Sequence, residues 1–302
     1  MNKDIFSINP EIEKAIAAER AVVALESTVI AQGLPRPQNL ETARRLEQID
    51  RAEGATPATI AVLSGKFCVG MDQDQVGRIA SGSDIKKLST RDLAIAVARA
   101  WNGATTVAST MWIAHRAGIN IFATGGIGGV HRGPLPDVSA DLPELSRTPM
   151  IVVCSGAKIV LDLPATREWL ETNSITVIGY RCDEMPAFYS RRSGLPVDVR
   201  CDSAAEVTQL YRTQRELGVA GALLVTVPVP VEAEVPEEEL NKILDQSLSV
   251  AEESNVTGRD LTPFLLRHMA ELSEGTTLRA NIALLENNAR VAATIARELK
   301  PV

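Results

Sequence analysis

The sequence predicts an α/β protein, a three-layer α/β/α sandwich with a mixed, largely parallel central sheet. Short apolar runs rich in Val, Ile and Ala recur along the chain, and stretches with helical spacing of apolar residues lie between them. This alternation is typical of strands joined by helices that cover the sheet. The 302 residues contain no internal repeat and no low-complexity linker, so we expect a single α/β domain over residues 1–302.

Apolar runs are expected to form strands over residues 22–25, 59–63, 105–109, 121–124, 151–154, 176–178, 197–199 and 223–227. Helices are expected over residues 39–53, 92–101, 168–172, 204–217, 237–254 and 277–299. Ligands of open α/β sheets collect beyond the carboxyl ends of the strands. Glu26, Ser27 and Thr28 follow the first run, and Ser109 and Thr110 end the third, so we expect these polar residues to face one crevice.

The composition excludes several classes of partner. A net charge of -7 argues against nucleic-acid polymers, which require a basic surface. No apolar run approaches the roughly 20 residues that cross a bilayer, and the first residues form no apolar signal segment. We therefore expect a cytoplasmic protein that acts on small molecules and not at a membrane. The cysteines are widely spaced and predict buried free thiols rather than disulfides or a zinc site: Cys68, Cys154, Cys182 and Cys201.

Two of the apolar runs lead directly into glycine-bearing turns. Residues 125–129 read Gly-Gly-Ile-Gly-Gly, and residues 155–158 read Ser-Gly-Ala-Lys. Glycine lets the backbone turn tightly and bring its N–H groups close to a ligand, commonly a phosphate. Neither turn matches GxGxxG or GxxxxGK[ST], so the mononucleotide motifs do not apply. A plain connection between strand and helix stays an alternative.

These turns and three further blocks carry a resemblance to a known family. VALESTVIAQGLPRPQN, NGATTVASTM, ATGGIGGVHRG, DVSADL and CSGAK occur in this order, and the resemblance runs from about Val22 to about Ala296. The chain resembles the pseudouridine-5′-phosphate glycosidases, which include proteins once called indigoidine synthase A. The resemblance implies a lyase that reversibly cleaves the carbon–carbon glycosidic bond of pseudouridine 5′-phosphate to uracil and ribose 5-phosphate. It also implies a manganese ion and a homotrimer.

Glu26 and Lys158 are the candidate catalytic residues. A carboxylate directly after a buried strand is costly unless it is paired or used, and partial burial would raise the pKa of Glu26 toward the range of a general acid. A helix or turn cap is the alternative for Glu26. The resemblance makes Glu26 the proton donor and Lys158 the nucleophile that forms a Schiff base. Without it, Lys158 would be read as a surface lysine that opens the next helix.

The resemblance also assigns residues to the metal and the substrate. It places the metal on Asp137, although Asp137 and Asp141, four residues apart, could equally form the acidic first turn of a helix. It places Lys87 on the substrate, with Lys86 adjacent, whereas residues 84–92 alone predict a solvated helix start capped by Ser89. The other residues that it puts against the substrate are Val107, Ser139, Ala140, Asp141 and Asn281.

His131 is a further candidate because it lies in the loop GGVHRG, beside the proposed site. A hydrogen bond that stabilises this loop is the alternative role for its side chain. Asn281 lies on the apolar face of the expected last helix, where an amide without a partner is costly.

Two other functions stay open from the sequence. A Schiff-base aldolase or other phosphosugar lyase would also carry a lysine after a strand and a phosphate-binding turn. A catalytically silent nucleotide-binding sensor would share the turns without the chemistry. Incubation with pseudouridine 5′-phosphate and manganese, followed by a search for free uracil, separates the three.

Overall fold

The structure is a computed structural model that describes residues 5–133 and 137–299. Its strands are β1 (Phe6–Ile8), β2 (Val22–Leu25), β3 (Thr56–Leu63), β4 (Lys66–Val69), β5 (Lys86–Leu88), β6 (Gly103–Thr105), β7 (Ile121–Ala123), β8 (Ile151–Cys154), β9 (Thr176–Tyr180), β10 (Val199–Cys201) and β11 (Leu223–Thr226). Its α-helices are α1 (Pro10–Ala17), α2 (Gln38–Ala52), α3 (Gln73–Ser81), α4 (Leu93–Ala98), α5 (Val107–Arg116), α6 (Asp141–Leu145), α7 (Leu163–Thr172), α8 (Ala204–Glu216), α9 (Glu237–Glu253), α10 (Leu261–Leu272) and α11 (Thr276–Glu298).

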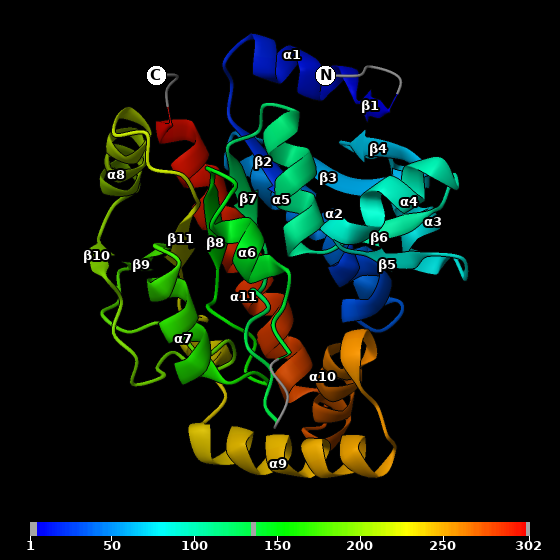
Figure 1. Cartoon of the computed structure of the whole chain (residues 1–302), viewed down its shortest axis with the longest axis vertical. Coiled ribbons are helices and arrows are strands. Elements are labelled where there is room, and N and C mark those ends of the chain that lie inside the picture. Colours follow the sequence, from blue (N-terminus) through cyan, green and yellow to red (C-terminus); the bar gives the residue numbers. More distant parts are fainter. Residues whose placement is uncertain (1–4, 134–136, 300–302) are drawn as a thin grey trace.

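All of these strands belong to one sheet (Figure 1). The order is β1-β4-β3-β2-β7-β8-β11-β9-β10, and β6 pairs with β3 and β5 with β6. Strand β3 is antiparallel to β4 and β6, and the other pairs are parallel. The predicted α/β class with a mixed, largely parallel sheet is therefore confirmed.

Helices cover the sheet from both faces (Figure 1). On one face α11 packs against β2, β7 and β8, with α2 and α8 beside it. On the other face α5 packs against β2 and β3 and contacts α6. Every residue of β2, β3, β8 and β11 is buried. Strands β2 and β8 read as continuous apolar runs, which explains why their positions could be predicted from the sequence. Strand β3 begins at Thr56, three residues before the expected start at Thr59, because Thr56 and Pro57 interrupt its apolar pattern.

The strand expected over residues 105–109 is wrong beyond Thr105. Strand β6 ends there, and Thr106 is the N-cap of α5, where its side chain accepts a hydrogen bond from the N–H of Ser109. The β-branched run favours a strand, but the cap ends the strand and starts the helix. Ser109 and Thr110 are consequently buried within α5, so their predicted place in the crevice is also wrong.

Residues 84–92 also differ from the expectation. Lys86–Leu88 is the short strand β5, not a solvated helix start, because its backbone pairs in parallel with β6. The predicted cap at Ser89 is confirmed for the 3-10 turn η2 (Thr90–Asp92), and Asp92 Oδ2 accepts the N–H of Ser89 at 3.0 Å. At the other side of the sheet, the strand expected over residues 197–199 begins two residues later, as β10.

Helices α9 and α10 stand apart from the sheet, at the lower end of the view in Figure 1. They pack against each other, and α10 also contacts α11 and the π-helical turn η1 (Val29–Gly33) that follows β2. The four cysteines are free, as predicted, and Cys182 is the one that is partly exposed. Within the described part of the chain, no helix has both the length and the apolar composition needed to cross a membrane.

Candidate active site

The carboxyl ends of β2, β7 and β8 lie side by side, because these strands are adjacent and parallel. Glu26 follows β2, residues 125–129 (the first glycine loop) follow β7, and residues 155–158 (the second glycine loop) follow β8. The two loops continue the parallel pairing through backbone hydrogen bonds, from Ser155 N to Gly125 O (2.8 Å), from Ile127 N to Gly156 O (3.0 Å) and from Lys158 N to Ile127 O (3.1 Å). The loops are thus a rigid extension of the sheet, as binding loops on an α/β scaffold often are.

Close packing explains why two positions in these loops are glycine. Gly156 has a φ of +79°, and a Cβ there would lie 2.1 Å from the carbonyl oxygen of Pro186. A Cβ on Gly126 would lie 2.7 Å from the ring of Phe188. Phe188 itself has a positive φ of 63°, uncommon for a bulky residue, and its N–H donates to Ser155 O at 3.0 Å. The segment around Phe188 therefore packs closely against both glycine loops.

Glu26 is a buried carboxyl group, with 8% of its surface exposed. The hydroxyl of Thr124, from the end of β7, donates to its Oε1, and the hydroxyl of Thr28 donates to its Oε2. Burial raises the pKa of Glu26, while the nearby charge of Lys158 and the two hydroxyl groups partly oppose the rise. The expected rise in pKa is thus present, and Glu26 holds its proton to a higher pH than an exposed carboxyl group does.

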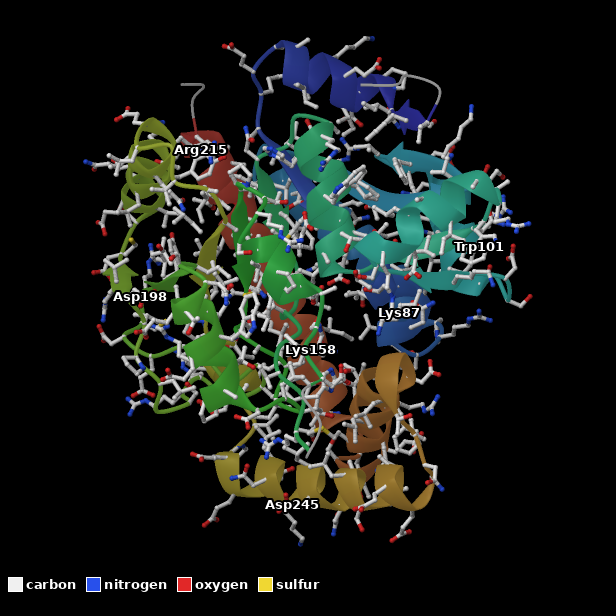
Figure 2. The ribbon with its side chains drawn as sticks, viewed as in Figure 1. Lys87, Trp101, Lys158, Asp198, Arg215 and Asp245 are labelled. Carbon is white, nitrogen blue, oxygen red and sulfur yellow. The ribbon has the colours of Figure 1, made fainter. Side chains whose placement is uncertain are left out.

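Lys158 ends the second glycine loop and is partly buried. Its Nζ donates to the carbonyl oxygen of Gly126 at 2.6 Å, so the first glycine loop holds the amine of the second. Figure 2 shows Lys158 and Lys87 toward the same end of the sheet, above α10. Lys158 acts electrostatically on both Glu26 and Lys87, which places the acid and the two amines in one cluster.

The structure distinguishes Lys87 from its neighbour. Burial lowers the pKa of Lys87, and the charge of Lys158 lowers it further, whereas Asp141 and Glu26 act in the opposite direction. Lys86 is exposed, and its Nζ lies 4.8 Å from the ring centroid of Trp101. Because side chains alternate along a strand, Lys87 faces the candidate site and Lys86 does not.

Asp141 ties the start of α5 to the first glycine loop. It is buried at the first position of α6, and its carboxylate accepts the N–H of Ala108 at 2.9 Å and that of Gly128 at 2.8 Å. Ser139 Oγ accepts the N–H of Asp141 at 3.2 Å. Val107, the first residue of α5, is buried directly beside this contact. The structure therefore brings Val107, Ser139, Ala140 and Asp141 together at the N-terminus of α5.

Ser27, the residue after Glu26, links the end of β2 to the end of β6. The hydroxyl of Ser27 accepts the N–H of Thr105 at 2.9 Å and lies 3.3 Å from the hydroxyl of Thr105. Thr105 is the last residue of β6, two positions before α5 begins. The end of β6 is thereby fixed beside the end of β2, as the expected crevice requires.

His131 and Asp137 lie next to each other at the edge of the site. The N–H of His131 donates to the backbone carbonyl of Asp137 at 2.8 Å. Burial lowers the pKa of His131, the charge of Asp137 acts to raise it, and Lys87 and Lys158 lower it. Asp137 is exposed, and residues 5–133 and 137–299 contain no group of three His, Cys, Asp or Glu side chains arranged to hold a metal ion. A single exposed carboxylate fits a largely hydrated divalent ion, not a closed protein cage.

Two asparagines of α11 lie seven residues apart and so share a helix face. Asn281 is buried, but no hydrogen bond joins its side chain to the rest of the described site. Asn288 is fully buried and contacts both glycine loops through its amide. Neither Asn288 nor Thr124 was predicted from the sequence as a site residue. The signal available for Asn288 was a second amide on the apolar face that already carried Asn281.

Comparison with known proteins gives matches over nearly the whole chain. A family model described as indigoidine synthase A like protein matches residues 11–298. A pseudouridine-5′-phosphate glycosidase from Geobacillus kaustophilus is 48% identical and is matched over 98% of this chain and 99% of its own. The protein of the same name from Paracoccus denitrificans is 49% identical, over 97% of each chain.

Solved structures agree with these matches. An indigoidine synthase A-like protein from Thermotoga maritima has a TM-score of 0.90 at 39% identity, covering 98% of this chain and 96% of its own. Prealnumycin C-glycosynthase AlnA, solved in complex with ribulose 5-phosphate, has a TM-score of 0.90 at 37% identity, covering 98% of this chain and 97% of its own. This chain therefore belongs to the indigoidine synthase A like family.

Proposed function

We propose that this protein is a pseudouridine-5′-phosphate glycosidase, which converts pseudouridine 5′-phosphate and water reversibly into uracil and ribose 5-phosphate. The observation that carries the proposal is that the buried acid Glu26 and the amine of Lys158, which interact electrostatically, lie at the carboxyl ends of β2 and β8, the two strands that flank β7. The name and the 45–49% identity of the curated relatives support it.

The bond to be broken explains why an amine is needed. A carbon–carbon glycosidic bond offers no oxygen or nitrogen leaving group to protonate, so the paired carboxylates of ordinary glycosidases are a poor solution. A neutral lysine amine can instead form a covalent intermediate at the anomeric carbon, which divides one difficult step into two easier ones. Lys158 fits this role because it ends the second glycine loop and interacts electrostatically with the buried Glu26.

We propose the following sequence of bonds. As the nitrogen of Lys158 bonds to C1′, the bond between C1′ and the ring oxygen breaks, and the ring oxygen keeps the electron pair and takes up the proton that the amine loses. The bond between C1′ and the uracil carbon then breaks, its electron pair stays on uracil, and Glu26 gives that carbon a proton. The lysine imine left on C1′ takes up water and releases ribose 5-phosphate.

The N-terminus of α5 and Lys87 are our proposed site for the 5′-phosphate. The positive end of the α5 dipole points toward this position, which suits an anion, although the N–H groups of Ala108 and Ser109 already donate to Asp141 and Thr106. Lys87 adds a positive charge from β5, where it pairs with Ala104, three residues before the first residue of α5. We propose that His131, Ser139 and Ala140 also contact the substrate, on the basis of the resemblance and of their positions beside Asp137 and Asp141. The resemblance alone supports the same proposal for Asn281.

The function is tested by incubating the protein with manganese and each of three compounds and measuring free uracil. Pseudouridine 5′-phosphate should release uracil, and unphosphorylated pseudouridine should react far more slowly, because it lacks the dianion that provides binding energy. Uridine 5′-phosphate should resist, because its uracil is bonded through nitrogen. Equal turnover of the three, or no uracil from any of them, would contradict the proposal.

A second candidate function is C-glycosyl transfer to an aglycone other than uracil. It is favoured by the similarity to AlnA, a prealnumycin C-glycosynthase whose structure contains ribulose 5-phosphate. The reverse reaction separates the two candidates. If the protein joins ribose 5-phosphate to uracil, the glycosidase is supported. If it forms a lysine adduct with the sugar but ignores uracil, a different aglycone is indicated.

Manganese is proposed as the cofactor, held by Asp137 and water molecules. When bound, such an ion would supply positive charge to the oxygens of the substrate. Asp137→Ala is expected to remove the manganese dependence of the rate and most of the activity while the fold stays intact, because the side chain is exposed. Titration of the variant with Mn²⁺, followed by electron paramagnetic resonance of the free ion, should show lost binding. Full activity of the variant in the presence of a chelator would exclude this role of Asp137.

The resemblance implies a homotrimer and the composition favours a cytoplasmic location, and we propose both. Light scattering of the purified protein measures the assembly, and a mass near that of one chain of 32.4 kDa would overturn the trimer.

A further inference from the structure

Asn288 contacts both glycine loops from α11, which lies on the face of the sheet opposite to α5. Its side chain is fully buried on α11, 133 residues from Ser155 and 164 from Thr124 along the chain. The amide Nδ2 donates to the carbonyl oxygen of Thr124 at 2.8 Å and lies 3.3 Å from that of Gly125. The hydroxyl of Ser155 lies 3.2 Å from Oδ1 and 3.1 Å from Nδ2. A buried amide is costly unless it is hydrogen-bonded, and here its partners lie in the two loops or next to them.

The hydrogen-bond partners of Asn288 contact the proposed catalytic groups or lie next to residues that do. Thr124, whose carbonyl accepts from Asn288, is also the residue whose hydroxyl donates to Glu26. Ser155 opens the loop that ends in Lys158, and the amine of Lys158 is held by Gly126, next to the second carbonyl that Asn288 contacts. One amide is thus linked on one side to the acid and on the other side to the amine.

The loops have a second set of connections that does not involve Asn288. The backbone hydrogen bonds between Ser155 and Gly125, Ile127 and Gly156, and Lys158 and Ile127 all join the loops directly. Loss of the amide should therefore leave the loops paired, but free to shift by a fraction of an ångström relative to α11. Shifts of this size matter for covalent chemistry, because a misplacement of about 1 Å can cost about 100-fold in rate.

We infer that Asn288 is a positioning residue that fixes the separation between the proton of Glu26 and the amine of Lys158. The inference rests on the proposed function of these two residues. Asn288 does not touch the substrate in this role. Its loss should therefore lower kcat, which depends on the alignment of the reacting atoms, and leave KM nearly unchanged, since the proposed phosphate site lies on β5 and α5.

The test compares Asn288→Ala with Asn287→Ala. Asn287 is the adjacent residue of the same helix, is partly buried, and donates to Pro228 O at 3.3 Å, a residue that belongs to neither loop. We expect kcat to fall roughly 10- to 100-fold for Asn288→Ala, with KM within about threefold, whereas Asn287→Ala should keep kcat within about twofold. Both variants are first checked by circular dichroism and thermal unfolding.

A third variant covers the case in which Asn288→Ala does not fold. Asn288→Asp keeps the size of the side chain, and only its protonated form can donate to the carbonyl of Thr124. Its rate relative to the wild type at each pH should recover as the pH falls. A folded Asn288→Ala with the kcat of the wild type would show that Asn288 does not position the catalytic groups. An Asn288→Asp whose relative rate does not change with pH would show the same.

Borohydride trapping of ribose 5-phosphate separates a failure of this inference from a failure of the proposed function. If the wild type gives no adduct on Lys158, the proposed chemistry is wrong whatever Asn288 does. If the wild type gives the adduct and Asn288→Ala releases uracil at the wild-type rate, the chemistry stands and the positioning role is wrong. The inference predicts an adduct on Lys158 in both proteins at similar rates, because imine formation does not require the proton of Glu26, together with uracil release that is at least about 10-fold slower in the variant.

Discussion

Lys158→Arg is expected to lower uracil release from pseudouridine 5′-phosphate by about 10⁴-fold or more. Arginine keeps the positive charge and can still donate to Gly126 O, but its guanidinium remains protonated in proteins and has no free electron pair with which to attack C1′. Loss of a covalent nucleophile removes the whole covalent route, so the effect should be large. Initial rates measured over a range of pH values are the appropriate assay.

Lys86→Arg is the matched control for this substitution. Lys86 is exposed, stacks on Trp101 and points away from the site, and arginine retains that stacking. Its rate should remain within about twofold of the wild type. A Lys158→Arg variant that retains a tenth of the wild-type rate would show that Lys158 is not the nucleophile.

Glu26→Gln is expected to lower kcat by about 10²- to 10⁴-fold, the usual range for loss of a general acid. Glutamine has nearly the same shape but carries no acidic proton. Burial raises the pKa of Glu26, so the wild-type rate should be highest where the carboxyl is protonated and should fall as the pH rises through this raised pKa. The residual rate of Glu26→Gln should lack that fall.

The two catalytic roles can be told apart in the same variant. Imine formation with ribose 5-phosphate requires the amine but not the proton for uracil, so Glu26→Gln should still trap the sugar on Lys158. Glu47→Gln is the control, because Glu47 is also a buried carboxyl group with a raised pKa and accepts from a threonine, Thr59, outside the site. A pH profile of Glu26→Gln identical to that of the wild type would remove Glu26 from the mechanism.

The sheet was largely predictable because its central strands are buried on both faces. The runs at β2 and β8 were predicted to the residue, since apolar residues fill them from end to end. Strand β5 is short and carries the charges of Lys86 and Lys87, so it shows neither a continuous nor an alternating apolar pattern. After β6, the helix cap formed by Thr106 outweighs the β-branched composition of residues 105–107. The composition alone therefore favours a strand where the structure begins a helix.

The candidate site was predictable where it depends on strand ends. Glu26 and Lys158 could be placed from the runs that precede them, because parallel neighbouring strands carry their ends to one edge. Contacts between distant segments could not be predicted in this way. Thr124 donates to Glu26 across 98 residues, and Asn288 reaches the loops from α11, so neither pairing leaves a local pattern in the sequence.

Reduction of the enzyme with borohydride in the presence of ribose 5-phosphate, followed by peptide mass spectrometry, tests the proposed chemistry most directly. One adduct is expected, with the mass of the sugar phosphate joined through a reduced imine, on the peptide that contains Lys158. It should be absent from Lys158→Arg and present in Lys86→Arg. An adduct on Lys87 or any other lysine, or no adduct from an enzyme that releases uracil, would contradict catalysis through Lys158.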